Sequence, residues 1–141
     1  MPDLVIRNAR IVDGSGGASF HGDVAIRGDR LAQVGGKAGA ARQQIDAEGL
    51  VLSPGFIDGH THMDAQVNWD AIGSPSCWHG VTSVVMGNCG FTLAPSRAQE
   101  RHLVVRNLER AEDISAAAMA EGIRWDWETF PEYLDAVDLL P

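Results

Sequence analysis

Positive charge is scarce in this sequence of 141 residues. The 11 Lys and Arg residues stand against 19 Asp and Glu residues, which gives a formal net charge of −8 with histidine neutral. Nucleic acids and anionic membranes are bound by clustered Lys and Arg, and the sequence contains no such cluster. The composition therefore argues against both partners, while 45% hydrophobic and 21% charged residues are typical of a globular protein.

Cysteine and long apolar runs are scarce as well. Cys77 and Cys89 are the two cysteines, and so low a count favours free thiols in a reducing compartment over a disulfide framework. No stretch reaches the ~18 apolar residues of a membrane span, and Met1-Pro2-Asp3 does not open a signal peptide. We therefore expect a cytoplasmic protein.

Residues 1 to 53 predict a small β domain. Short stretches of alternating apolar and polar residues are separated by turns rich in glycine, which is the pattern of half-buried strands. Gly28-Asp29 lies between two such stretches and predicts a two-residue hairpin turn. After His62 the pattern changes, and a β-branched run followed by helical stretches predicts βα units.

An apolar run that ends in two histidines is the most informative stretch for chemistry. If Phe56 to His62 is a strand, His60 and His62 share one face, with Cβ atoms about 6.5 Å apart. Two neutral imidazoles at that spacing can bind one zinc ion or another borderline metal. Asp58 and Asp64 add carboxylates of the kind that orient metal-bound imidazoles. A His-x-His pair taken alone is also compatible with the polar end of a strand.

The run from His79 to Gly87 predicts a parallel strand that is buried on both faces, because it is apolar on both. Cys89 follows it and would lie at the C-terminal tip, where barrel enzymes place active-site residues. A thiolate there, beside His60 and His62, would give three metal ligands. The alternative is a small buried side chain, a common role of free cysteine. Cys77 and His79 precede the strand, and we expect them to be structural.

Helices are predicted beyond Pro95. Ser96 with Gln99 has the spacing of a capping box at the start of a first helix, and Thr129 with Glu132 has the same spacing before a later one. Between them, Ser115 to Glu121 predicts a short alanine-rich helix. Trp125 and Trp127 are expected to pack in front of the last helix, with the mouth of a substrate pocket as the alternative.

These residues carry a resemblance to a known family. Pro54 to His62 resembles the first-strand metal motif of the amidohydrolase superfamily. The stretches Ser76–Gly90 and Trp125–Leu134 are similar to the N-acyl-D-amino-acid deacylase (D-aminoacylase) branch of that superfamily. The resemblance extends over essentially the whole chain. In that branch the cysteine that matches Cys89 binds metal.

The resemblance implies a fold, a cofactor and an incomplete chain. The fold class would be α/β with a β appendage, in which residues 1–53 are an N-terminal β-sandwich portion and residues 54–141 begin a (β/α)8 (TIM) barrel. The cofactor would be zinc, as one or two ions. Because a complete barrel needs about 250 residues, we interpret the chain as an N-terminal fragment. The family's remaining histidine ligands and catalytic aspartate lie on later strands, so this chain alone is expected to be inactive.

The leading hypothesis for function is zinc-dependent hydrolysis of the amide bond of N-acyl-D-amino acids by a metal-activated water. His60, His62 and Cys89 would be the ligands, and Asp58 or Asp64 would support them. The substrate partner would be a small N-acyl amino acid. One alternative is a hydantoinase-like or dihydroorotase-like hydrolase of cyclic amides. Another is a non-catalytic metal-binding module, although structural zinc sites usually have four protein ligands.

Overall fold

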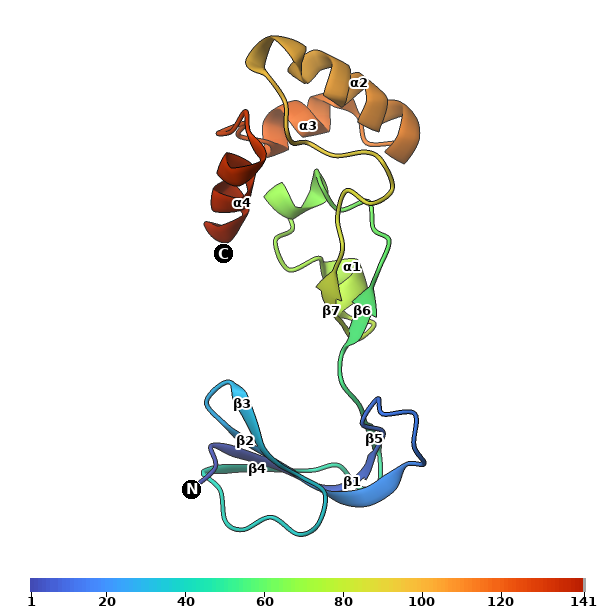
Figure 1. Cartoon of the computed structure of the whole chain (residues 1–141), viewed down its shortest axis with the longest axis vertical. Coiled ribbons are helices and arrows are strands. Elements are labelled where there is room, and N and C mark those ends of the chain that lie inside the picture. Colours follow the sequence, from blue (N-terminus) through green and yellow to red (C-terminus); the bar gives the residue numbers. More distant parts are fainter. Residues whose placement is uncertain (141) are drawn as a thin grey trace. The chain divides into compact units, whose positions relative to one another are not determined.

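The computed structural model describes residues 1–140 (Figure 1). The chain divides between Pro54 and Gly55 into two compact units. The first unit contains only strands, and the second contains a pair of strands followed mainly by helices. Among the described residues, no helix combines the length and the apolar composition needed to cross a membrane.

The first unit is a five-stranded sheet. Its strands have the order β3-β2-β1-β4, and the short β5 pairs with β1 beyond β4. The β1–β2 and β2–β3 pairs are antiparallel, whereas β4 and β5 run parallel to β1. The strands are β1 (Leu4–Ile11), β2 (Phe20–Arg27), β3 (Arg30–Val34), β4 (Gln43–Asp46) and β5 (Val51–Leu52). The predicted hairpin is confirmed, because Arg27 pairs with Arg30 across Gly28-Asp29.

One face of this sheet carries an open apolar hollow of about 290 Å³. Side chains from β1, β2 and β3 line it, among them Ile6, Val24 and Leu31, and Leu31 is 67% exposed. Residues 1–54 therefore form a single sheet with apolar side chains on an uncovered face. A second layer, as the predicted sandwich requires, is not formed within the described part of this unit.

Asp23 is the polar centre of the first unit. Its buried carboxylate accepts hydrogen bonds from the backbone N–H groups of Ala38 (2.9 Å) and Asn8 (3.1 Å) and from the Arg7 guanidinium (3.0 Å). The bond from Ala38 is the main cause that lowers the pKa of Asp23, and Asn8 and Arg7 add to it. A lowered pKa means that the fold prefers the ionised form. This stabilisation is complete above the ordinary pKa of 3.8 and is lost as pH falls through the lower native value.

Asp23→Asn is expected to lower the free energy of unfolding by about 1.5–3 kcal/mol, since hydrogen bonds to a charged group are lost. The substitution should also flatten the loss of stability at acid pH. Urea unfolding over a series of pH values measures both effects. Asp29→Asn is the matched control, because the Asp29 side chain is 87% exposed and lies 3.8 Å from Arg30. Equal destabilisation by the two substitutions would contradict this account.

The second unit begins with two parallel strands, β6 (Phe56–Asp58) and β7 (Val81–Val84). The predicted parallel pairing is confirmed, and the connection contains the 3-10 turn Gln66–Asn68 and the short helix α1 (Ser74–Cys77). The prediction that the first strand reaches His62 is wrong. The Asp58 carboxylate accepts the backbone N–H of His60 at 3.1 Å, and such a local side-chain bond offers the backbone an alternative to strand pairing.

The prediction that β7 is buried on both faces is also wrong. Val81 is half-buried, and the residues from Thr82 to Val84 are exposed. Within residues 1–140, β7 pairs with β6 alone, so one of its edges has no strand beside it. A run of β-branched residues predicts a strand whose side chains can be buried. Whether they are buried depends on the strands and helices that pack beside it.

Three helices complete the second unit: α2 (Arg101–Glu112), α3 (Ala116–Gly122) and α4 (Phe130–Asp138). The prediction of a capping box at Thr129 and Glu132 is confirmed. Ser115 caps α3 by accepting the N–H of Ala118 at 3.2 Å. The helices and the segments that connect them form the largest apolar cluster among the described residues, and its buried members include Leu93, Leu108, Met119, Ile123, Trp127 and Tyr133.

The predicted capping box at Ser96 and Gln99 is wrong. Ser96 is buried, its hydroxyl has no partner in the structure, and its backbone N–H donates to the carbonyl of Glu128 at 2.9 Å. The Glu128 carboxylate instead accepts the N–H of Ala98 at 3.0 Å. A distant residue therefore takes the capping role, and a 3-10 turn at Ala98–Glu100 precedes α2.

Trp127 packs in the core, as predicted. Its indole N–H donates to the carbonyl of Leu93 at 3.1 Å, and its ring meets Tyr133 edge to face with centroids 5.1 Å apart. Trp125 is half-buried, with the Arg101 guanidinium 5.4 Å from its ring centroid. These contacts anchor α4 and the start of α2 to the same cluster.

Candidate metal centre

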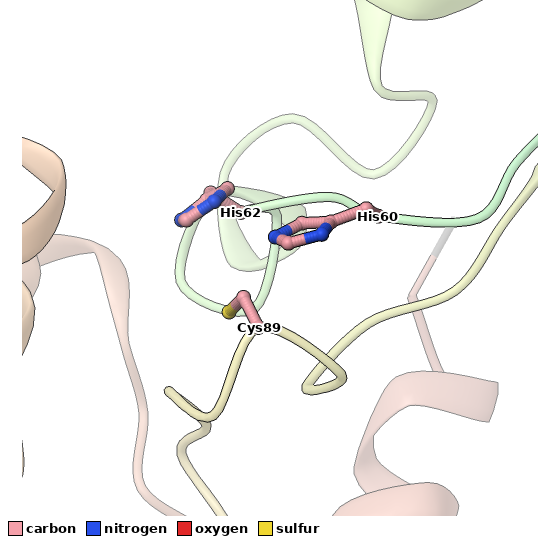
Figure 2. Close-up of side chains that lie close together, drawn as sticks. All are labelled: His60, His62 and Cys89. Carbon is pink, nitrogen blue, oxygen red and sulfur yellow. The ribbon is translucent and has the colours of Figure 1, made fainter.

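The structure brings His60, His62 and Cys89 together, and Figure 2 shows their side chains. One ligand atom of each residue lies within 4.8 Å of the others. The two imidazole rings are stacked, with centroids 5.4 Å apart and planes inclined by 23°. Both histidines are exposed and Cys89 is half-buried. The three side chains can therefore approach a common point.

Two loops supply these residues. His60 and His62 lie in the loop after β6, and Cys89 lies in the loop after β7. The Thr61 hydroxyl donates to the carbonyl of Val85 at 2.8 Å, and the Asn88 side-chain amide donates to the carbonyl of Gly59. Parallel strands end at the same edge of a sheet, and these two bonds then hold the loops together. The site thus follows from the β6–β7 pairing and not from alternation along one strand.

The two predicted supporting carboxylates contact backbone groups. Asp58 accepts the N–H of His60, and Asp64 accepts the N–H of Gly87 at 3.3 Å. Asp64 is buried, and burial is the main cause that raises its pKa. Both residues therefore shape the two loops that carry the ligands. A direct role toward an imidazole stays a prediction for each of them.

Glu112 is the carboxylate that contacts an imidazole, and sequence reasoning missed it. Its Oε1 lies 3.0 Å from Nδ1 of His62, and its side chain is only 3% exposed. Burial is the main cause that raises the pKa of Glu112. One signal was available in the sequence, since a negative charge is unfavourable at the C-terminal end of a helix, and Glu112 is the last residue of α2.

The remaining candidates lie apart from this site. Cys77 and Cys89 are free thiols, as expected. Cys77 belongs to α1, where its thiol lies 3.6 Å from the carbonyl oxygen of Ser74. His79 is an exposed side chain before β7. Among the described residues, the cluster of His60, His62 and Cys89 is the group with suitable spacing for a metal ion.

The donor set fits zinc. Two imidazole nitrogens and one thiolate are ligands that zinc accepts, and thiolate disfavours the hard cations Mg²⁺ and Ca²⁺. Three protein ligands, rather than four, are typical of catalytic zinc, which keeps one coordination position for water or substrate.

Comparison with known proteins identifies the family. Residues 43–140 match the model of Amidohydro_3, the Amidohydrolase family. The chain therefore belongs to the amidohydrolase family.

Individual relatives confirm the predicted branch. The chain is 37% identical over 140 residues to the D-aminoacylase of Alcaligenes xylosoxydans xylosoxydans, a match that covers 99% of this chain and 27% of that protein. A D-aminoacylase structure studied for its binuclear metal centre is similar with a TM-score of 0.77 at 34% identity, covering 97% of this chain and 27% of the other.

A third similarity is to N-acyl-D-glutamate deacylase from Bordetella bronchiseptica, solved with zinc and a phosphonate inhibitor. The TM-score is 0.72 at 30% identity, and the match covers 99% of this chain and 27% of the other. The chain thus spans about a quarter of the length of these relatives.

Proposed function

We propose that the protein to which this chain belongs is a zinc-dependent hydrolase of N-acyl-D-amino acids, and that this chain supplies its first metal ligands. The convergence of His60, His62 and Cys89 is the observation that carries the proposal. The relatives support the substrate class, since they are a D-aminoacylase and an N-acyl-D-glutamate deacylase.

The chain's own residues would prepare this site in a defined way. His60 and His62 would offer neutral nitrogens and Cys89 a thiolate, so that the three ligands together carry one negative charge. The hydrogen bonds from the Thr61 and Asn88 side chains would hold the two loops in a fixed position relative to each other. When bound, zinc lowers the pKa of water towards neutrality and polarises an amide carbonyl.

We further propose how the two units fit the fold of the longer protein. Residues 1–53 would be a β-sandwich portion, and the apolar hollow on their sheet is the face that a second layer would cover. Residues 54–141 would begin a (β/α)8 barrel, with β6 and β7 as neighbouring parallel strands. Ligands in the loops after both strands agree with the C-terminal face at which barrel enzymes place their active sites.

Hydrolysis assays on the complete gene product test the proposed activity. We expect the zinc-loaded protein to release acetate from N-acetyl-D-methionine or another N-acetyl-D-amino acid, and the matching L-enantiomers serve as the control. Removal of zinc by a chelator should abolish the activity, and added zinc should restore it. Faster turnover of a hydantoin than of any acyl-D-amino acid would instead indicate a cyclic-amide hydrolase.

A further inference from the structure

Glu112 is held beside the metal site by a rigid element. Leu108, one helical turn earlier on α2, is only 1% exposed and belongs to the main apolar cluster. Residues four apart lie on the same face of a helix, so the packing that buries Leu108 also fixes the position of Glu112. The Glu112 carboxylate is consequently buried, and its Oε2 has no hydrogen-bond partner.

His62, in contrast, is not fixed by packing. Its side chain is 48% exposed, and a neutral imidazole can carry its proton on either of two nitrogens, so burial alone selects neither nitrogen. Oε1 of Glu112, at 3.0 Å from Nδ1, is the side-chain hydrogen-bond partner of this ring. Within residues 1–140 the ring of His60 has no hydrogen bond of this kind. The two histidines of the motif therefore differ in how the protein orients them.

We propose that Glu112 is the positioning residue for His62. Oε1 of Glu112 lies 3.0 Å from Nδ1 of His62, and an ionised carboxylate only accepts hydrogen bonds. With Glu112 ionised, Nδ1 of His62 therefore carries the proton and Nε2 keeps its lone pair for the metal. Glu112 thereby selects one tautomer and one ring orientation before any ion arrives. The inference rests on the proposed function only for the identity of the metal, because the tautomer is a property of the metal-free protein.

Ring nitrogen NMR of the metal-free gene product tests the proposal directly. With ¹⁵N-labelled histidine at about pH 8, where imidazole is neutral, we expect the His62 proton on Nδ1, with the resonance assigned by its loss in His62→Gln. In Glu112→Leu the ring should change to the tautomer mixture of a free imidazole. Glu121→Leu is the matched control, since Glu121 is an exposed glutamate of α3.

Zinc affinity supplies the second readout. Loss of a carboxylate that orients a metal-bound histidine typically weakens binding by about 10–100-fold, and we expect this for Glu112→Leu and no change for Glu121→Leu. The proposal is overturned if wild-type His62 carries its proton on Nε2, or if Glu112→Leu leaves the tautomer unchanged. A wild-type protein that binds no zinc would refute the proposed function, and the NMR result would still decide the role of Glu112.

Discussion

Replacing Cys89 with serine is expected to lower kcat/KM of the zinc-loaded gene product by about 1000-fold, because a bound metal stabilises the transition state by several kcal/mol. Serine is nearly the same size, but its hydroxyl is not ionised at neutral pH and is a poor zinc ligand. Zinc affinity should fall by more than the ~10–100-fold that is typical of changes to supporting residues. The measurements are zinc content after dialysis and steady-state kinetics on an N-acyl-D-amino acid.

Cys77→Ser is the matched control for this prediction. Cys77 is the other free thiol of the chain and lies in α1, outside the cluster of His60, His62 and Cys89. We expect the control to keep its zinc and its activity. Cobalt substitution adds an independent test, since the thiolate-to-cobalt absorption should vanish in Cys89→Ser and persist in Cys77→Ser. Equal losses in both variants would show that neither thiol is a specific ligand.

Gly55→Ala is expected to destabilise the second unit by about 1–3 kcal/mol, the usual cost of overpacking. A Cβ atom at Gly55 would overlap Oγ1 and Cγ2 of Thr82 and would lie 2.6 Å from the Cβ of Thr82. Rotation of the Thr82 side chain cannot relieve all three contacts, because its Cβ is fixed to the backbone of β7. The start of β6 would have to move away from β7. The shift of the urea midpoint at unchanged slope measures the effect.

Gly59→Ala is the control for this substitution. A Cβ atom there would meet no atom within 4 Å, and Gly59 does not have a positive φ. Its effect should stay within about 0.5 kcal/mol, as for surface substitutions in general. The double variant Gly55→Ala/Thr82→Ala should recover part of the lost stability. If Thr82→Ala brings no recovery, the close approach to Thr82 is not the cause.

Local patterns predicted the parts of the fold that depend on nearby residues. Alternation located the strands of the first unit, and Gly28-Asp29 marked its hairpin. The spacing of Thr129 and Glu132 predicted a cap that forms within one helical turn. Ser96 had the same spacing, yet Glu128, which follows α2 and α3 in the sequence, took its place. A capping signature is therefore reliable only where no distant acceptor competes for the same N–H groups.

The candidate site was predictable in its members but not in its supports. His60, His62 and Cys89 are identified by residue type and by their positions after strands, and the structure brings them together. The contact of Glu112 with His62 joins residues 50 positions apart, and its formation depends on how α2 packs. The backbone turn at Asp58, in contrast, could be predicted from the sequence. An aspartate two residues before His60 is a local signal for such a turn.

Because β6 pairs with β7, the metal site joins two segments that are far apart in the sequence. His62 and Cys89 are 27 positions apart in the sequence (89 − 62), and the segment between them must close on itself before both can reach one ion. An ion bound there would act as a cross-link that favours the closed form by mass action. The supply of metal would then determine how long newly made protein keeps this segment open. When zinc is withdrawn, the two loops would be the first segments to be cleaved by proteases.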